Sequence, residues 1–355
     1  MKVITHNQLD LAVYKEWHAL WEKSSYANAS NSPAWLTSLL KAYSYQTFRI
    51  MMFYRNNKLV AVAYVVKEKR FGLSCYTAGP GNFSYGVPFL LDPKDTRVIK
   101  EIGTQLRSMG TVVLDNIPQK FIARSHRYIP EVRFIPQTRN YFLRLQNDIQ
   151  KNSMLPLYKL FMKKAKKYNE RITFKRFKGF SKNAMKSVFQ IDKENAKYNQ
   201  GYLTFVNQKH KELYKSLAQN LKEHFTTHLL YFDKKPIAYE MGFVIGSTYF
   251  ANQISYLRAY RFLAPGKVII VKLLESISQK NIIKIDFGSG ESDIKQKLTN
   301  EYDVLSHVVI AKHNSISQYI IICHSMRDKL YQLVNKNKKL YSLYRTIRNG
   351  RKIIS

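Results

Sequence analysis

The segment Leu263-Ala264-Pro265-Gly266-Lys267-Val268 has the residue types of a phosphate-binding turn. It stands between a strand predicted over 248–255 and an apolar helix predicted over 268–279. The first turn of a helix carries backbone N–H groups without partners and the positive end of the helix dipole. Glycine lets an anion approach the backbone, and Lys267 adds charge. These six residues therefore predict a cradle for a pyrophosphate such as that of coenzyme A. A plain connection between strand and helix is the alternative.

Three carboxylates have the sequence context of a general base. Asp286 stands at the predicted C-terminal end of a strand over 282–287, where the sites of α/β proteins open. Glu240 stands in the middle of a predicted strand among apolar residues, where a carboxylate is costly unless it is paired or used. Glu194 lies near the end of a helix predicted over 180–195. A structural ion pair is the alternative for each of them.

The sequence predicts no metal site. His224 and His228 are four residues apart, but a strand is predicted to begin between them, whereas such a pair of ligands needs one helix face. The two cysteines, Cys75 and Cys323, lack metal-knuckle spacing and could form one disulfide at most. Neither a nucleophile elbow nor a Walker loop occurs. The first residues lack the apolar stretch of a signal peptide, and no apolar run approaches 18 residues, so we expect a reduced, cytoplasmic protein.

Helical and extended patterns alternate along the chain, which predicts a mixed α/β fold. A meander of three antiparallel strands is expected before the turn at Gly266. The helix that follows should return the chain to a strand parallel to the one before it. Helices are predicted over 11–23, 33–40, 97–108, 155–167, 180–195, 209–223 and 268–279, and strands over 48–54, 59–66, 111–114, 172–177, 227–232, 236–243, 248–255 and 282–287.

Three blocks of the sequence resemble the CelD/BcsL family of GNAT acetyltransferases. They cover residues 236–243, 256–267 and 285–295, and they follow the family's G-x-x-I-A strand, its (S/A)-P-G turn and its D-F-x-x-G-x-x-x-Y-K segment. The resemblance covers residues ~150–300 and weakens in the first half, where Ser32-Pro33-Ala34-Trp35-Leu36 fits an S-P-x-W-L entry. Such proteins, like the FemAB aminoacyltransferases, have two GNAT-like halves. The first half here has no Pro-Gly turn before a helix, which implies a degenerate copy.

The resemblance implies transfer of an acyl group from acetyl-CoA or another acyl-CoA to an amine. The acceptor would be an amino sugar, a sugar nucleotide or a lipid-linked precursor of a surface polysaccharide, which makes an amine-bearing glycan or glycolipid the expected partner. Glu194 is a candidate through the resemblance, because it precedes Asn195 and Lys197 in a match to the family's Glu-x-x-(Trp)-Lys pattern, with Ala196 in place of Trp. Lys295, the last residue of the third block, is a fourth catalytic candidate. A backbone N–H at the splay of two parallel strands would bind the thioester carbonyl. Ile294 replaces the family's tyrosine and cannot protonate the leaving thiolate, so the general acid stays open.

The chain is strongly basic, with 58 Lys and Arg against 24 Asp and Glu, a net charge of +34 and a pI near 10.0. Such a balance favours a polyanionic partner, although codon usage in an AT-rich genome is an alternative. A second hypothesis is therefore a FemAB-like or carrier-dependent acyltransferase that uses aminoacyl-tRNA or an acyl carrier protein. A third is a non-enzymatic nucleic-acid-binding protein. No RNP, zinc-finger or helix-turn-helix signature supports it, so a nucleic-acid partner is disfavoured.

Overall, two tandem GNAT-like domains are expected, with mixed sheets flanked by helices and a basic helical tail. Residues 1–150 would form the degenerate first domain, 151–314 the acyltransferase domain and 315–355 the tail. The tail has nine Lys and Arg against one Asp, and its leucines recur at helical spacing. Such a helix could lie on an anionic membrane surface, which would place the protein peripherally on the inner face. A helix packed on the domain with a solvated basic face is the alternative.

Overall fold

The computed structural model describes residues 1–80, 88–125, 132–145, 168–195, 204–278 and 281–336. The helix predicted over 155–167 and the end of the tail, 337–355, lie outside this range. The strands are β1 (Lys2–His6), β2 (Phe48–Arg55), β3 (Lys58–Arg70), β4 (Leu73–Thr77), β5 (Phe89–Leu90), β6 (Val112–Pro118), β7 (Arg133–Arg144), β8 (Ile172–Lys178), β9 (Phe225–Phe232), β10 (Lys235–Ile245), β11 (Thr248–Tyr256), β12 (Lys284–Ser289) and β13 (Tyr302–Ile310). The helices are α1 (Leu11–Lys23), α2 (Pro33–Tyr43), α3 (Thr96–Ser108), α4 (Gln119–Ser125), α6 (Lys182–Lys193), α7 (Gln208–Asn220), α8 (Pro265–Ser278), α9 (Asp293–Leu298) and α10 (Asn314–Lys336), with short 3-10 turns η1 (Ala29–Asn31), η2 (Asn169–Arg171) and η4 (Arg258–Leu263).

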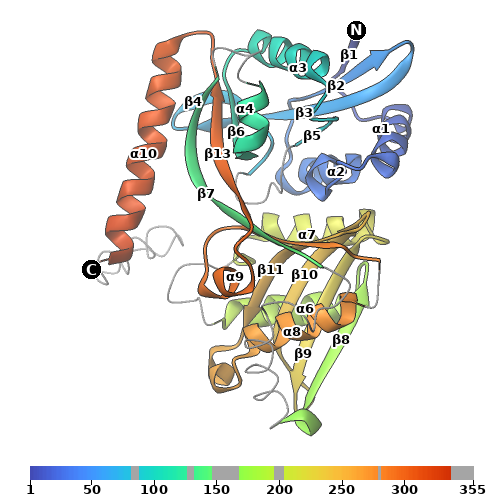
Figure 1. Cartoon of the computed structure of the whole chain (residues 1–355), viewed down its shortest axis with the longest axis vertical. Helices are drawn as coiled ribbons and strands as arrows, with labels where there is room; N and C mark the ends of the chain where they lie inside the picture. Colours follow the sequence, from blue (N-terminus) through green and yellow to red (C-terminus); the bar gives the residue numbers. More distant parts are fainter. Residues whose placement is uncertain (81–87, 126–131, 146–167, 196–203, 279–280, 337–355) are drawn as a thin grey trace.

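All of these strands belong to one mixed sheet, in the order β1-β2-β3-β4-β6-β13-β7-β12-β11-β10-β9-β8, with β5 beside β3. The sheet runs through both halves of the molecule, which lie one above the other in Figure 1. The expected α/β fold with mixed strands, flanking helices and a helix after the last strand is confirmed. The two expected sheets are joined edge to edge by β7 and β13, neither of which is among the predicted strands.

Local signals explain the first two helices. Asp10 caps α1 by accepting a hydrogen bond from the Val13 N–H at 2.9 Å, and Ser32 caps α2 in the same way, with Pro33 in the first turn. The apolar faces of both helices carry buried tryptophans, Trp17 and Trp21 on α1 and Trp35 on α2. These contacts secure the helices against the sheet, and the helix predicted over 11–23 is confirmed with the same bounds.

Strands β2 and β3 are buried on both faces, because their side chains alternate between two cores. Ile50 and Met52 pack with α1 and α2, whereas Met51 and Phe53 pack with the apolar face of α3. The first of these cores continues into the C-terminal half, where α2 packs on α7 and the rings of Trp35 and Phe243 lie 6.4 Å apart. The two halves therefore share apolar packing. The division at residues 150 and 314 stays a prediction, and β13 crosses it by pairing with β6.

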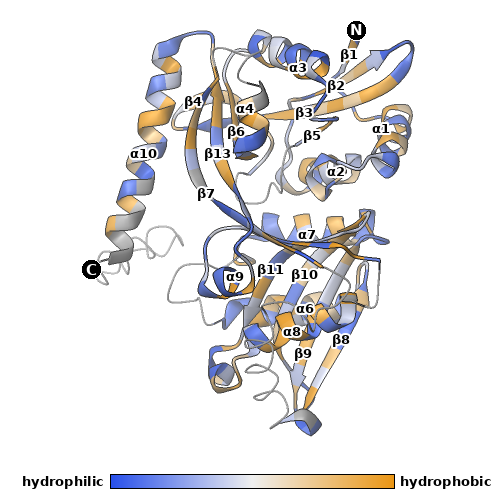
Figure 2. Ribbon diagram, viewed as in Figure 1, coloured by the Kyte–Doolittle hydropathy of each residue, from blue (hydrophilic) through white to orange (hydrophobic). Residues whose placement is uncertain are grey.

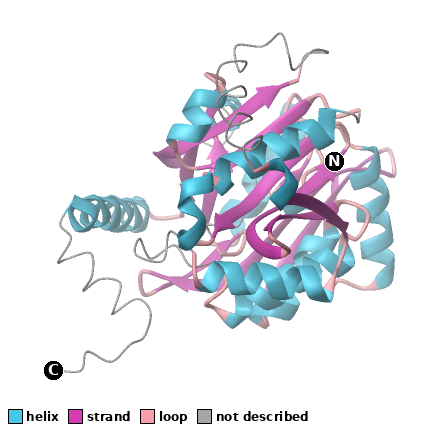
Figure 3. Ribbon diagram, turned by 90° about the horizontal axis from the view of Figure 1, so that it is seen from below, coloured by secondary structure: helices cyan, strands magenta, loops and turns pink. Residues whose placement is uncertain are grey.

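The C-terminal half contains the predicted meander. Strands β9, β10 and β11 are antiparallel neighbours, and α8 then returns the chain to β12, which pairs parallel with β11. Helices cover both faces of the sheet (Figure 3). On one face, the Tyr239 hydroxyl bonds Asp192 of α6, and on the other the ring of Tyr256 packs against Gly266 of α8. Tyr239 of β10 and Tyr256 of β11 thus contact helices on opposite faces of the sheet.

Helix α10 follows β13 and leaves the body of the molecule. Ser317, Ile320 and His324 form its buried face, whereas Met326 and Leu330 are more than half exposed. Figures 1 and 3 both show the helix projecting to one side of the sheet. Across the described residues, no helix combines the length and the apolar character that crossing a membrane requires.

Candidate active site

Two parallel strands part at the C-terminal end of β11. The β11–β12 ladder runs from Thr248↔Lys284 to Phe250↔Asp286 and then ends, while β11 continues to Tyr256. On its other edge β12 pairs with β7, which draws it away from β11. Beyond Phe250, the backbone groups of β11 that point away from β10 therefore face a gap. This is the splay that the family resemblance implies.

A cavity of about 610 Å³ opens beside this gap. Its size is that of a site for a small molecule or cofactor. The end of β11, the first turn of α8 and the short helix α9 form its walls. The lining residues are Tyr256, Arg261, Ala264, Gly266, Lys267, Ser292, Asp293, Ile294, Lys297 and Leu298.

The turn before α8 is closed by its own backbone. Ala264 has a left-handed conformation, with φ of 49°, and its carbonyl accepts the N–H groups of Lys267 at 2.8 Å and Val268 at 3.1 Å. Pro265 has no N–H group. The Gly266 N–H makes no hydrogen bond with any residue that the structure describes. An anion at this helix start would thus find one available backbone donor there, and side chains must supply the remaining contacts.

Gly266 has a steric reason to be glycine. A Cβ atom at this position would lie 3.2 Å from Cδ1 and 3.3 Å from Cε1 of the Tyr256 ring. The missing side chain lets the helix start approach the end of β11, which brings Lys267 and Tyr256 to the same cavity. A larger residue would push these two walls apart.

The cavity has an excess of positive charge. Arg261, Lys267 and Lys297 contribute three cations against the single carboxylate of Asp293, a net of +2. Of the six residues predicted to bind the donor, Ala264, Gly266 and Lys267 line the cavity. Leu263 and Val268 are each 2% exposed and pack in the core beneath it, and Pro265 is buried in the turn.

Asp286 and Lys295 hold the loop that follows β12. Asn140 of β7 donates its amide to both oxygens of Asp286 at 3.0 Å, and the Gly288 N–H donates at 2.9 Å. Lys295 Nζ donates to the carbonyls of residues 288, 289 and 290 at 2.8–3.0 Å. The carboxylate of Asp286 and the ammonium of Lys295 therefore fix the conformation of one loop. These contacts give both residues a structural role, as distinct from a catalytic one.

Glu240 lies in a buried polar cluster under α8. Its Oε2 accepts the hydroxyl of Tyr249 at 2.6 Å and contacts Nδ1 of His228 at 2.8 Å, and all three side chains are at most 2% exposed. Phe174 stacks on the His228 ring with centroids 5.3 Å apart. Burial, and then the negative charge of Glu240, raise the pKa of Tyr249 well above its ordinary value, so the phenol keeps its proton.

Glu194 is the exposed carboxylate of the three. It forms the C-cap of α6, and its neighbour Asn195 makes a β-bridge with Leu257, the residue after Tyr256. Glu194 therefore stands near the end of β11, although it is not among the residues that line the cavity. The structure brings Asp286 and Lys295 together on one loop, but it does not join them with Glu240 or Glu194 in one cluster.

Tyr256 is a functional candidate that the sequence analysis did not single out. Its side chain is half-buried in the cavity wall, and its hydroxyl forms no hydrogen bond with any described residue. Ile294, which stands where the resembling family has tyrosine, lines the same cavity as an apolar surface. The strand predicted over 248–255 ends one residue short of Tyr256, and the pairing of that residue with Ala238 could not be known from local sequence.

One segment of the chain matches a known protein family. Residues 164–296 match the Acetyltransferase (GNAT) domain family, and this range contains the splay, α8 and eight of the ten residues that line the cavity. The match covers 133 of the 355 residues, and it identifies this segment as a GNAT-type acyltransferase domain. No curated protein matches it. The assignment to the CelD/BcsL family stays a prediction.

Similar solved structures share the fold across both halves. FemX superposes with a TM-score of 0.64 at 10% identity, covering 90% of this chain and 100% of that one. The C-terminal domain (DUF2156) of a putative lysylphosphatidylglycerol synthetase from Agrobacterium fabrum has a TM-score of 0.58 at 9% identity, covering 87% and 94%. L-PGS from Bacillus licheniformis has a TM-score of 0.57 at 13% identity, covering 89% and 96%. The fold of this chain is therefore theirs.

Proposed function

We propose that the chain transfers an acyl group from acyl-CoA to an amine and that the donor binds in the cavity at the start of α8. The observation that carries this proposal is the joint position of three features: the splay of β11 and β12, the available Gly266 N–H and a cavity with a net charge of +2. A pyrophosphate needs a backbone donor and cations, and a pantetheine arm needs an open edge of a strand.

Each part of the site then has a role. The Gly266 N–H, Lys267 and Arg261 hold the pyrophosphate, and a backbone N–H of β11 in the gap binds the thioester carbonyl. The amine attacks the carbonyl carbon and the C–S bond breaks. Glu194 accepts the proton that the amine loses, and the Tyr256 hydroxyl protonates the leaving thiolate. Glu240 stays in the buried cluster that supports the sheet.

The acceptor class rests on the sequence resemblance. An amine of an amino sugar, a sugar nucleotide or a lipid-linked precursor of a surface polysaccharide is proposed, with residues 151–314 as the catalytic unit and 1–150 as a degenerate GNAT-like unit. The exposed row on α10 supports a place at the inner membrane face. Tyr319, Ile322, Met326, Leu330 and Leu333 are 47–60% exposed and recur at helical spacing.

A second candidate is a donor carried by a polyanion, either aminoacyl-tRNA or an acyl carrier protein. Two observations favour it: the net charge of +34, and the closed turn in which the Ala264 carbonyl occupies two of the N–H groups at the start of α8. A thiol-release assay with acetyl-CoA, with a long-chain acyl-CoA and with carrier-bound donors separates the two candidates. Turnover with carrier-bound donors alone would reject the CoA assignment.

Binding of acetyl-CoA tests the proposed site directly. Lys267→Gln should weaken the donor affinity about 10- to 100-fold, since a hydrogen bond to a charged group contributes ~1.5–3 kcal/mol. Gly266→Asp should abolish binding, because it adds bulk at the Tyr256 ring and a negative charge beside the pyrophosphate. Lys272→Gln is the matched control, because it removes a cation from α8 that does not line the cavity. Calorimetry gives the affinities. Equal affinity in the wild type and the Gly266→Asp variant would sink the assignment.

A further inference from the structure

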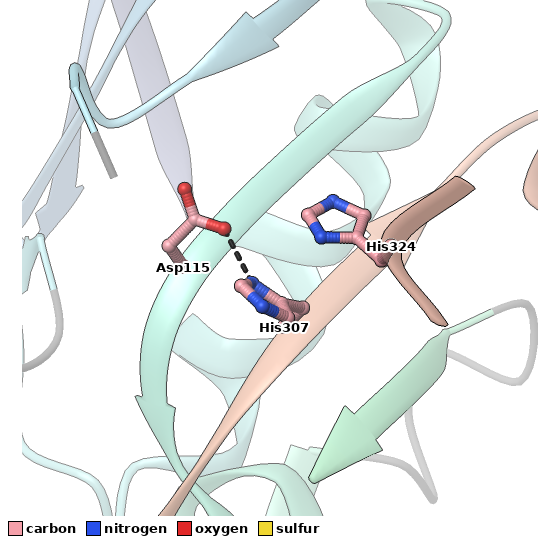
Figure 4. A group of neighbouring side chains, drawn as sticks. All are labelled: Asp115, His307 and His324. Carbon is pink, nitrogen blue, oxygen red and sulfur yellow. Dashed lines mark hydrogen bonds and ion pairs between the residues drawn. The ribbon is translucent and has the colours of Figure 1, made fainter. Parts of the chain in front are cut away.

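Three buried polar side chains meet far from the acyl-donor cavity. Asp115 comes from β6, His307 from β13 and His324 from α10, and Figure 4 shows them converging from these three elements. Their exposed fractions are 5%, 2% and 0%. One oxygen or nitrogen from each lies within 4.8 Å of those of the other two. Asp115 and His307 are 192 positions apart in the sequence, so no local motif announces the cluster.

Asp115 is fixed by two partners. Its Oδ1 lies 2.5 Å from Nδ1 of His307, and its Oδ2 accepts a hydrogen bond from Nη1 of Arg70. The ion pair with the Arg70 guanidinium favours the charged form of this buried carboxylate. The carboxylate is therefore ionised. Its contact with His307 fixes the orientation of that imidazole beside the carboxylate.

His324 has no polar partner for either ring nitrogen. Both nitrogens are buried, and neither forms a hydrogen bond with any residue of the described chain. The ring lies against His307, with centroids 4.2 Å apart, and its other aromatic neighbour is Phe71 at 4.8 Å. Burial without a hydrogen-bond partner favours the neutral imidazole, which has a nitrogen lone pair. A buried polar group left without a partner costs ~1–3 kcal/mol, and an ion is a common explanation for one.

Charged side chains surround the cluster. Glu68 and Asp115 share Arg70 between them, and Nη2 of Arg327 lies 3.4 Å from Nε2 of His307. Two carboxylates and two guanidinium groups leave a net charge of zero when both imidazoles are neutral. An ion bound to Nε2 of His307 would have to replace the contact with Arg327.

We infer that Asp115, His307 and His324 form a binding site for one divalent transition-metal ion of the zinc class. Two imidazoles and a carboxylate are the ligands that Zn²⁺ and its neighbours prefer, whereas Ca²⁺ and Mg²⁺ prefer oxygen ligands alone. The ion would satisfy the ring of His324. It would also tie α10 to β6 and β13, because each ligand comes from a different element. The role of the ion would be structural, because the site does not share a residue with the acyl-donor cavity.

Metal uptake by the whole chain tests this inference. Protein stripped with a chelator should bind about one Co²⁺ or Zn²⁺ per chain, and Co²⁺ should develop visible absorption bands of nitrogen and oxygen ligation. His324→Leu and Asp115→Asn should each lose this uptake. His313→Leu is the matched control, because His313 is exposed just before α10. Zn²⁺ should also raise the Tm of the wild type and of the control, since an ion that binds the folded state stabilises it.

Two results would overturn the site. The first is a stripped wild-type protein that takes up no more Co²⁺ than the His324→Leu variant. The second is a Tm that Zn²⁺ leaves unchanged in the wild type, which needs no variant and so remains decisive if a substitution prevents folding. If the cluster only packs and binds no ion, both of these results are expected.

Discussion

At the scale of the residue, surroundings separate carboxylates that look alike in the sequence. Glu240 is sealed between Tyr249 and His228, and Asp286 is occupied by an amide side chain and a backbone N–H. Glu194 is exposed at the end of α6, beside the last residues of β11. A general base must reach the proton that it removes, so access decides among the three.

Glu194→Gln should lower kcat about 100-fold or more, because an amide cannot accept the amine proton, while the affinity for the donor stays unchanged. Thiol release measures the turnover, and calorimetry measures the affinity. Asp286→Asn should instead lower the free energy of unfolding by ~1–3 kcal/mol, since an amide facing Asn140 loses a hydrogen bond. Wild-type turnover in Glu194→Gln, together with a 100-fold loss in a stably folded Glu240→Gln, would move the role of base to Glu240.

At the scale of the element, the register of β10 and β11 builds the buried cluster. The pairing shifts between Met241 and Gly242, and the Tyr249 ring crosses over Gly242 to reach Glu240. A Cβ atom on Gly242 would lie 2.5 Å from the Phe250 carbonyl oxygen and 2.5 Å from the Tyr249 hydroxyl. Glycine at this position therefore permits both the bulge and the hydrogen bond.

Gly242→Ala should lower the free energy of unfolding by about 3 kcal/mol, because one of the two contacts is with backbone that cannot move aside. Urea denaturation measures the change. Gly246→Ala is the matched control: the site has open space but a φ of 55°, so strain alone should cost about 1–2 kcal/mol there. If the two variants lose equal stability, the close approach of Tyr249 and Phe250 to Gly242 does not stabilise the buried cluster.

Elements with local signals could be predicted from the sequence, and elements defined by distant partners could not. The capping residues Asp10 and Ser32 predict the starts of α1 and α2, and alternating apolar residues predict the three strands of the meander. Strand β7 contains Pro136, a residue that argues against a strand. Strand β13 contains His307, a polar residue that can be buried because it contacts the carboxylate of Asp115. The splay was implied by the family resemblance, whereas the place of Tyr256 in the cavity wall depends on strand register.

At the scale of the whole molecule, β13 makes the two halves one sheet and then leads into α10. Removing residues 315–355 would uncover the core around Ile320 and would delete His324, so a deletion would test folding as much as attachment. The exposed apolar row on α10 can be changed without touching that buried face. Figure 2 shows apolar residues recurring along the helix among polar ones.

The full chain should float with vesicles that contain anionic phosphatidylglycerol and should remain behind with vesicles of neutral phosphatidylcholine. The apolar row would enter the interface while nearby cations, such as Lys329, approach the headgroups, each contributing about 1 kcal/mol near the surface. High salt should weaken flotation, because it screens these charges. The triple variant Ile322→Ser, Met326→Ser, Leu330→Ser should stay unbound, since it removes apolar area and leaves every charge in place. Leu11→Ser, at a site 67% exposed on the other half, should float like the wild type. A triple variant that floats as well as the wild type would show that charge alone holds the protein to anionic surfaces and that α10 has no part in orienting it there.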